Sequence, residues 1–279
     1  MALIVQKYGG TSVANIEKIR GVAGRVVRQH NKGHQIVVVL SAMAGQTDFL
    51  IQLAREMTDD PDPRELDVLM STGEQISVAL FAMAVKNIGH DARSFLGFQV
   101  AIHTDNLYGK ARIHTIETDR IKKELQQGRI VTVAGFQGLD EKGDITTLGR
   151  GGSDTTAVAL AASLKADVCE IYTDVDGVYT TDPAICSKAK KLDVISYEEM
   201  LEMASLGAKI LETRSVEFAK KYNVPIHVRS SFSNERGTMV IAETEDMEKV
   251  MVSGVTYNKN EARVTIRKVP DKPGTASRI

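Results

Sequence analysis

The stretch that decides the fold is the apolar run Leu3-Ile4-Val5, followed at once by Lys7-Tyr8-Gly9-Gly10-Thr11-Ser12. We interpret it as a β-strand that runs into a glycine turn and opens a helix, which Thr11 or Ser12 can cap. Backbone N–H groups at a helix N-terminus lack intrahelical partners, and the helix dipole adds positive potential there. The two glycines let an anion approach, and Lys7 adds a positive charge. The pattern predicts a phosphate site, with an ordinary turn beside a surface lysine as the alternative.

The segments that follow this turn complete a βαβ unit. Residues 13–30 carry apolar side chains at helical spacing, and residues 36–40 are a continuous apolar, mostly β-branched run. Such a run is typical of a strand that is buried on both faces of a parallel sheet. Residues 130–134 and 168–172 repeat this pattern. The chain is therefore predicted to be an α/β protein with a mainly parallel sheet.

Helical spacing and glycine or proline positions predict the remaining elements. A long helix at residues 64–88 is expected to be interrupted at Ser71-Thr72-Gly73-Glu74-Gln75. The other expected helices are residues 46–57, 118–127, 157–164 and 196–222, the last broken at Gly207. The other expected strands are short segments around Gly97 and Gly109, a hairpin turning at Lys142-Gly143, and residues 225–229 and 238–242.

The composition is that of a globular protein. The chain has 279 residues, 43% of them hydrophobic and 25% charged, with a net charge of −1. The balanced charge argues against broad binding of nucleic acid or anionic membranes, although local basic patches stay open. No apolar run approaches the roughly 20 residues that span a bilayer. The two cysteines, Cys169 and Cys186, make neither a disulfide framework nor a zinc site and favour a cytosolic setting.

A second glycine-rich loop, Gly149-Arg150-Gly151-Gly152-Ser153-Asp154-Thr155-Thr156, leads into a helix of small residues. It places a guanidinium, a hydroxyl and a carboxylate within five residues. Arginine can bind a carboxylate or phosphate through two parallel hydrogen bonds. The loop therefore predicts an anion site. The alternative is that Ser153 or Asp154 only caps the helix and that Arg150 lies on the surface.

Three further stretches are candidates for the site. Ser41-Ala42-Met43-Ala44-Gly45-Gln46-Thr47 follows the second predicted strand, at the sheet edge where α/β proteins bind ligands, or else forms only a turn. Residues 173–183 are rich in acids and hydroxyls and suit a nucleotide; they lack the spacing of an EF-hand. Glu74 could face solvent, serve in a capping box or project into a site. Asp59-Asp60-Pro61-Asp62 is expected to be a solvated loop rather than a metal site.

The character of the chain changes near Glu243. Residues 250–257 and 261–269 are predicted strands, and residues 270–279 have the pattern of a helix entry. So short a tail cannot build its own core, and we expect the chain to be a piece of a longer protein. The expected division is residues 1–245 and 246–279. An apolar sheet edge at residues 250–269 would favour association.

Five motifs in this order resemble those of the aspartokinases, in the amino acid kinase superfamily. The motifs are Lys7-Tyr8-Gly9-Gly10-Thr11-Ser12-Val13, Ser71-Thr72-Gly73-Glu74, residues 149–154, residues 173–183, and Gly207-Ala208-Lys209. The family more often has Phe at the position of Tyr8. The likeness covers residues 1 to about 245 and implies a three-layer αβα sandwich, the amino acid kinase fold. The tail, with Val269-Pro270-Asp271-Lys272-Pro273-Gly274, resembles the start of the family's regulatory ACT region.

The resemblance implies ATP-dependent phosphorylation of the L-aspartate side chain to 4-phospho-L-aspartate, the first step towards lysine, threonine and methionine. ATP and Mg²⁺ would be the cofactors. A carboxylate nucleophile is already ionised at neutral pH, so the protein has to align two anions and neutralise charge rather than supply a base. The family also implies a cytoplasmic homo-oligomer that lysine or threonine inhibits through the ACT region, with no nucleic-acid or membrane partner.

The same resemblance assigns roles to residues. Lys7 would stabilise the transferring phosphoryl group, Asp154 would orient Lys7, and no residue is assigned to a metal. Arg150 would bind a substrate carboxylate and Glu74 the substrate ammonium. The expected substrate-binding residues are Thr47, Glu74, Arg150, Gly151, Gly152 and Ser153. The expected ATP-binding residues are Lys7, Tyr8, Gly9, Gly10, Ser41, Thr173, Asp174, Tyr179, Thr180, Thr181, Asp182, Pro183, Ala184 and Lys190, with Lys191 as the alternative to Lys190.

Other classes of function fit less well. The sequence has no Walker GxxxxGK[ST] motif, no HRD or DFG motif, and no full GxGxxG after a predicted strand. One rival is another amino acid kinase, acting on glutamate or acetylglutamate; the motif ending at Glu74 and the ACT-like tail argue against it. A second rival is a non-catalytic amino-acid sensor on the same scaffold, which the presence of Lys7 and Asp154 argues against.

Overall fold

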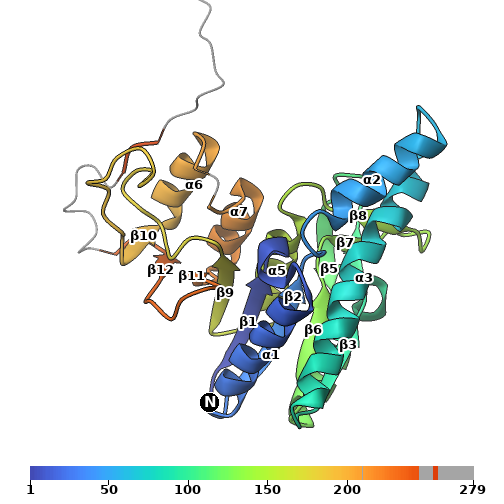
Figure 1. Cartoon of the computed structure of the whole chain (residues 1–279), viewed down its shortest axis with the longest axis horizontal. Helices are drawn as coiled ribbons and strands as arrows, with labels where there is room; N and C mark the ends of the chain where they lie inside the picture. Colours follow the sequence, from blue (N-terminus) through green and yellow to red (C-terminus); the bar gives the residue numbers. More distant parts are fainter. Residues whose placement is uncertain (209, 245–253, 257–279) are drawn as a thin grey trace, which may run out of the picture.

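The computed structural model describes residues 1–208, 210–244 and 254–256. The predicted tail strands, apart from residues 254–256, and Lys209 of the fifth motif lie outside this part of the chain. Figure 1 shows the path of the chain from the N-terminal strand to the C-terminal elements.

The molecule is built on an eight-stranded sheet in the order β10-β12-β11-β9-β1-β2-β6-β3. Its pairings are parallel except for that of β11 with β12. The prediction of a mainly parallel sheet is confirmed. The strands of this sheet are β1 (Leu3–Tyr8), β2 (Gln35–Leu40), β3 (Ala92–Phe95), β6 (Ile130–Ala134), β9 (Val168–Thr173), β10 (Val194–Ser196), β11 (Ile226–Ser230) and β12 (Thr238–Ile241).

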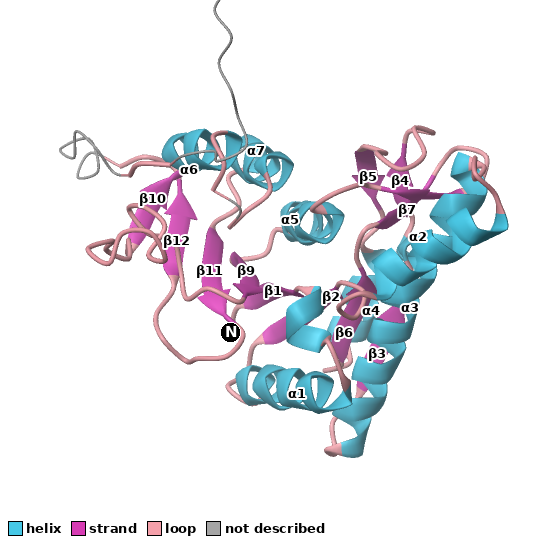
Figure 2. Cartoon of the chain, turned by 45° about the horizontal axis from the view of Figure 1, so that its top comes forward, coloured by secondary structure: helices cyan, strands magenta, loops and turns pink. Residues whose placement is uncertain are grey.

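A smaller four-stranded sheet stands beside α2, in the order β5-β4-β7-β8 (Figure 2). β4 pairs with β5 and β7 with β8 in antiparallel fashion, which confirms the short antiparallel strands and the hairpin, whose turn has Gly143 at a φ of +87°. The strands are β4 (Ile102–Thr104), β5 (Ile113–Ile116), β7 (Gln137–Leu139) and β8 (Ile145–Thr147).

Helices cover both faces of the large sheet, as a three-layer αβα sandwich requires (Figures 1 and 2). α1 (Ile16–His30) and α3 (Pro63–Asn87) bury apolar side chains against one face. The helices whose side chains join the core of the other face are α4 (Asp119–Gln126), α5 (Gly152–Leu164), α6 (Tyr197–Ser205) and α7 (Thr213–Tyr222). The core on this second face contains Cys169, Met200 and Met203.

The glycine turn after β1 opens into a short 3₁₀ helix, η1 (Gly10–Val13), before α1 begins. The prediction that Thr11 or Ser12 caps the long helix is wrong. Asn15 is the cap, because its side chain accepts a hydrogen bond of 2.9 Å from the backbone N–H of Lys18. The extra turn puts the caps of η1 and α1 at different residues.

α3 runs without a break through Ser71-Thr72-Gly73-Glu74-Gln75, so the predicted interruption is wrong. The hydroxyls of Ser71 and Thr72 donate to the carbonyls of Val68 and Leu69, which satisfies them inside a helix. By length and composition α3 would suffice to cross a membrane, yet half of its most apolar window is buried inside the protein, as in a core helix.

The other differences are local. Gly97 begins a 3₁₀ helix, η2 (Gly97–Val100), rather than a strand. The predicted helix at residues 196–222 is divided into α6 and α7, with Gly207 in the break at a φ of +117°, as expected. β10 was not predicted from the sequence, because three residues leave too little periodicity to detect. α2 (Gln46–Met57) begins and ends where the sequence places it.

Candidate active site

The topology of the large sheet creates the site. The chain passes from β1 to β2 on one side, whereas β9 pairs with β1 on the other, so the strand order reverses at β1. Ligands of open α/β sheets bind at such a switch point, outside the carboxyl ends of the strands. The loops that leave β1, β2 and β6 at this edge line a cavity of about 560 Å³.

Most of the predicted transfer and substrate residues line this one cavity. The residues that it brings together are Lys7, Gly9, Gly10, Ser41, Thr47, Glu74, Arg150, Gly151, Gly152, Ser153 and Asp154. They come from β1, the turn after it and η1, from the loop after β2, from α2 and α3, and from α5 and the loop before it. Segments that are far apart in the sequence therefore meet at one edge of the sheet.

Lys7 and Asp154 form an ion pair in the wall of the cavity. The Lys7 Nζ lies 2.6 Å from the Asp154 Oδ1, and both side chains are largely buried, at 13% and 11% exposed. Lys7 is the penultimate residue of β1, and Asp154 lies in the first turn of α5. The pair holds the ammonium of Lys7 at the end of β1, although the two residues are far apart in the chain.

Both glycine-rich loops are packed so tightly that side chains would not fit. A Cβ on Gly10 would lie 2.9 Å from the Ala42 carbonyl oxygen, and one on Gly152 would lie 2.8 Å from the Phe136 ring. Gly151 has a φ of +66° and is the N-cap of α5. The alternative that Ser153 or Asp154 caps this helix is wrong, since α5 has no side-chain cap.

Glu74 is buried inside α3, at 3% exposed, and lines the cavity. Its Oε1 accepts a hydrogen bond of 3.0 Å from the backbone N–H of Ala42. Its Oε2 has no hydrogen-bond partner among the described residues. Burial raises the pKa of Glu74 to about 7, and the Ala42 hydrogen bond opposes this only in part. Of the three roles left open by the sequence, projection into the site is the one observed.

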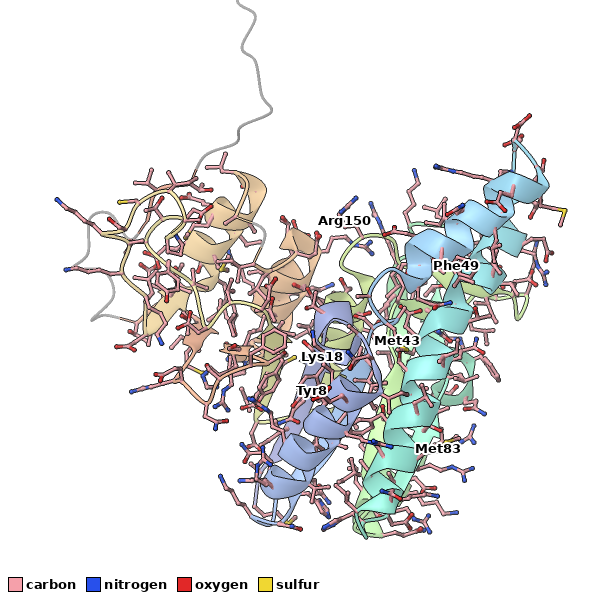
Figure 3. The ribbon with its side chains drawn as sticks, in the orientation of Figure 1. Tyr8, Lys18, Met43, Phe49, Met83 and Arg150 are labelled. Carbon is pink, nitrogen blue, oxygen red and sulfur yellow. The ribbon has the colours of Figure 1, made fainter. Side chains whose placement is uncertain are left out.

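Arg150 supplies the exposed positive charge of the cavity. It lies on the loop that joins β8 to α5, and Figure 3 shows it at the open edge of the molecule, between α7 and α2. The described part of the chain gives it no ion pair. Thr47 stands in the first turn of α2, and Ser153 in that of α5. The cavity therefore offers two cations, Lys7 and Arg150, together with hydroxyl groups and a buried carboxylate.

No residue of the predicted nucleotide loop lines this cavity. The loop follows β9, the strand beside β1, and is held by its own contacts. Tyr179 donates to the Asp176 carboxylate at 2.9 Å, and the backbone of Thr180 pairs with that of Lys190 at 2.9 Å. The predicted ATP-binding residues that lie outside the cavity are Tyr8, Thr173, Asp174, Tyr179, Thr180, Thr181, Asp182, Pro183, Ala184 and Lys190.

The two candidate lysines in this loop have different surroundings. The Lys191 Nζ lies 3.7 Å from the Asp176 carboxylate, whereas Lys190 is exposed and forms no ion pair within the described residues.

Tyr8 differs from the other residues that were predicted to bind ATP. Its side chain is buried and stacks on Tyr172, with ring centroids 4.5 Å apart, so only its backbone is available at the turn.

Several cavity residues were not singled out as site residues from the sequence. Asp48 and Ile51 continue the α2 face that Thr47 begins, and Gly109 and Phe136 come from loops beside the small sheet. Helical spacing from Thr47 points to Ile51. Nothing local indicates Gly109 or Phe136, because both reach the cavity through tertiary packing. Across the described residues no three His, Cys, Asp or Glu side chains gather as a set of metal ligands.

Comparison with known proteins agrees with this fold. The amino acid kinase family model matches residues 2–230. The chain is 59% identical over 280 residues to an aspartate kinase of Pseudomonas putida, and 56% identical over 281 residues to an aspartokinase of Pseudomonas aeruginosa. Each alignment covers 100% of this chain and 68% of the relative.

Solved structures give the same result. The aspartate kinase from Synechocystis has a TM-score of 0.78 at 51% identity, over 87% of this chain and 40% of that chain. Escherichia coli aspartokinase III, in complex with aspartate and ADP, has a TM-score of 0.79 at 31% identity, over 88% of this chain and 65% of that chain. A UMP kinase from Bacillus anthracis, at 17% identity and a TM-score of 0.64, shares the fold alone. By sequence and by structure, the chain belongs to the amino acid kinase family, among its aspartokinases.

Proposed function

We propose that the chain transfers the γ-phosphoryl group of ATP to the side-chain carboxylate of L-aspartate, giving 4-phospho-L-aspartate and ADP. This reaction would open the route to lysine, threonine and methionine. The observation that carries the proposal is the cavity in which the Lys7–Asp154 pair, Arg150 and the buried Glu74 meet at the sheet edge. The relatives that align with the whole of this chain are named aspartate kinase or aspartokinase, which supports the same substrate class.

The chemistry requires alignment and charge neutralisation rather than a base. A carboxylate oxygen of aspartate attacks the γ-phosphorus, the bond to the β-phosphate oxygen breaks, and ADP leaves with its electron pair. The aspartate carboxylate is ionised at neutral pH and needs no proton removed. Lys7 lies where it can offset the charge of the phosphoryl group in flight, and Asp154 keeps its ammonium in place.

The other groups of the substrate have matching partners in the cavity. Arg150 is free to bind the α-carboxylate through its planar guanidinium. The unpartnered Oε2 of Glu74 suits the substrate ammonium, which carries hydrogen-bond donors and the opposite charge. Thr47, Gly151, Gly152 and Ser153 complete the walls around these two groups. Glutamate is longer by one methylene, and acetylglutamate carries no ammonium, so both lose part of this set.

ATP would lie across the ends of β1, β2 and β9. Gly9 and Gly10 leave their backbone free of side chains at the phosphate end, Ser41 follows β2, and Thr173 is the last residue of β9. The loop from Tyr179 to Ala184 and Lys190 would hold the rest of the nucleotide. Mg²⁺ is bound in kinases chiefly through substrate phosphates and water. That mode fits a site whose described residues include no carboxylate cluster, so Mg²⁺ would arrive with ATP.

We infer the biological setting from the same relatives. Escherichia coli aspartokinase III has been solved in complex with lysine and aspartate. We propose that residues 1–245 form the catalytic domain and that residues 246–279 are a linker and the start of an ACT region. Lysine or threonine would inhibit through that region, in a cytoplasmic homo-oligomer.

The test is a coupled assay of ADP release with L-aspartate, L-glutamate and N-acetylglutamate as alternative acceptors. The proposal predicts turnover with aspartate and little with the other two acids. Turnover that prefers glutamate or acetylglutamate would identify a different amino acid kinase. Aspartate binding without ADP release would identify a sensor instead.

A further inference from the structure

Two charged side chains outside the cavity, one buried and one half-buried, hold the chain segments that support Arg150. Asp67 lies on α3 and Arg214 on α7, and neither lines the cavity. Both bind the backbone at residues 109–111 and 147–148. These two segments come from the loop before β5 and from the end of β8.

Asp67 accepts hydrogen bonds from both segments at once. It is fully buried, and its two carboxylate oxygens lie 3.0 and 2.9 Å from the Gly109 backbone nitrogen. The same oxygens accept from the backbone N–H of Thr147 at 2.7 Å and from its hydroxyl at 2.7 Å. Burial raises the pKa of Asp67, and these hydrogen bonds lower it, which shows that they support the ionised form.

Arg214 binds the same two segments through their carbonyls. Its Nη1 donates to the Leu148 oxygen at 2.7 Å and its Nη2 to the Ala111 oxygen at 2.9 Å. One guanidinium fork therefore spans the two segments, a geometry that a lysine cannot reproduce. Asp67 accepts hydrogen bonds from N–H and O–H groups, and Arg214 donates hydrogen bonds to carbonyls. Together they therefore bind both the donors and the acceptors of these two segments.

The two segments lie directly against one another and lead into the cavity. The backbone N–H of Ala111 donates to the Thr147 carbonyl at 2.9 Å. Gly149 has a φ of +76°, and a Cβ there would lie 2.8 Å from the Gly109 oxygen. Gly109, Gly149 and Arg150 all line the cavity. A shift of residues 109–111 or 147–148 would therefore move the backbone that carries the Arg150 guanidinium.

We propose that Asp67 and Arg214 are positioning residues that fix the Arg150 loop and thereby set the affinity for the carboxylate substrate. This inference rests on the proposed function. The phosphate end of the site stands on β1 and η1, which neither residue contacts through a hydrogen bond or ion pair in the described chain. Their loss should weaken aspartate binding far more than ATP binding, because the paired hydrogen bonds between a guanidinium and a carboxylate require both groups in a fixed geometry.

The experiment measures KM for each substrate and kcat on the full chain carrying Asp67→Asn, Arg214→Gln or Arg214→Lys. Asp67→Asn replaces one of the two acceptor oxygens with an NH₂ group, which can only donate and so cannot bind the N–H and O–H groups that face it. We expect KM for aspartate to rise about tenfold in Asp67→Asn and Arg214→Gln, with KM for ATP and kcat changed less than about threefold. Arg214→Lys keeps the charge but loses the fork, and its effect should fall between these and wild type.

Arg129→Gln is the matched control. Arg129 forms ion pairs with Asp91 and Glu124 away from the cavity, so its loss should leave KM for both substrates unchanged. Thermal melting of each variant identifies any that fails to fold; if Asp67→Asn does, the two Arg214 variants decide the question. An unchanged KM for aspartate, or equal rises in both KM values, would overturn the inference. Wild type without aspartate-dependent turnover would instead overturn the proposed function.

Discussion

Glu74 shows at the scale of one residue how the fold prepares a site at a cost in stability. Its carboxylate is buried, and one oxygen is without a partner among the described residues, which disfavours ionisation and raises its pKa to about 7. A substrate ammonium would supply the missing opposite charge. The sequence left its role open, because one acidic residue in a helix carries no information about which neighbours cover it.

The raised pKa predicts how activity depends on pH. In the free protein Glu74 is mostly protonated at pH 6 and mostly ionised at pH 8. We expect kcat/KM for aspartate to rise through an apparent pKa near 7, since this ratio reports groups of the free enzyme. Glu74→Gln should lower kcat/KM at pH 8 and remove this rise. A profile that keeps the same inflection in the variant would assign it to another group.

The same shift predicts how stability depends on pH. The folded pKa lies above the ordinary value of 4.5, so the folded state binds the proton more tightly than the unfolded state does. The stabilisation that the protonated Glu74 gives the folded state is fully present below pH 4.5 and is lost as pH rises through 7. Glu74→Gln should therefore be more stable than wild type at pH 8, by on the order of 2 kcal/mol, in urea unfolding. The exposed Glu117→Gln is the control, expected to change little.

In the proposed reaction, we expect the transfer step to depend most on Lys7. Lys7→Ala removes the ammonium that Asp154 holds at the end of β1. We expect kcat to fall roughly 10²–10³-fold, which is the usual effect of losing one preorganised hydrogen-bond donor that stabilises charge in the transition state. Steady-state ADP release measures this. Lys86→Ala, on the exposed side of α3, removes a lysine of equal charge and should leave kcat unchanged. A Lys7→Ala protein with full turnover would refute the assigned role.

At the scale of elements, burial explains which predictions held. β2 and β6 are buried along nearly their whole length, and so their sequences are mostly apolar runs that local pattern detects. β1 and β9 were also detected, although each buries one polar side chain: the Gln6 amide donates to the Glu170 carboxylate at 2.7 Å. The break expected in α3 was wrong because the low helix propensity of Ser71, Thr72 and Gly73 can be offset by hydrogen bonds and packing in the folded protein. Here the hydroxyls bond to the helix backbone, and Gly73 is required by a neighbouring loop.

Gly73 provides a test of that packing. A Cβ at this position would lie 2.8 Å from the Ala42 Cβ, so Gly73→Ala should destabilise the protein by about 1–3 kcal/mol despite the better helix propensity of alanine. The matched control is Gly21→Ala in α1, where nothing lies within 4 Å of the added Cβ. That variant should be stabilised by up to about 1 kcal/mol. Denaturant unfolding of both compares them; a stabilised Gly73→Ala would contradict the packing argument.

At the scale of the whole molecule, the parallel sheet brings together residues that the sequence separates widely. Two glycine-rich loops could be identified from local pattern, and the family likeness implied that they act together. That the Lys7 ammonium reaches Asp154 follows from β1 passing beneath α5, which no local pattern encodes. Asp67 and Arg214 escaped prediction for the same reason, since each is one charged residue in an amphipathic helix.

We propose that the protein phosphorylates the side chain of aspartate in this cavity. The most direct measurement incubates the full chain with Mg-ATP and L-aspartate, follows ADP release, and traps the acyl phosphate with hydroxylamine. We expect aspartate-dependent ADP release with a stoichiometric aspartyl hydroxamate, and neither product in quantity with glutamate or acetylglutamate. ADP release that does not depend on aspartate, or a hydroxamate formed only from another acid, would contradict it.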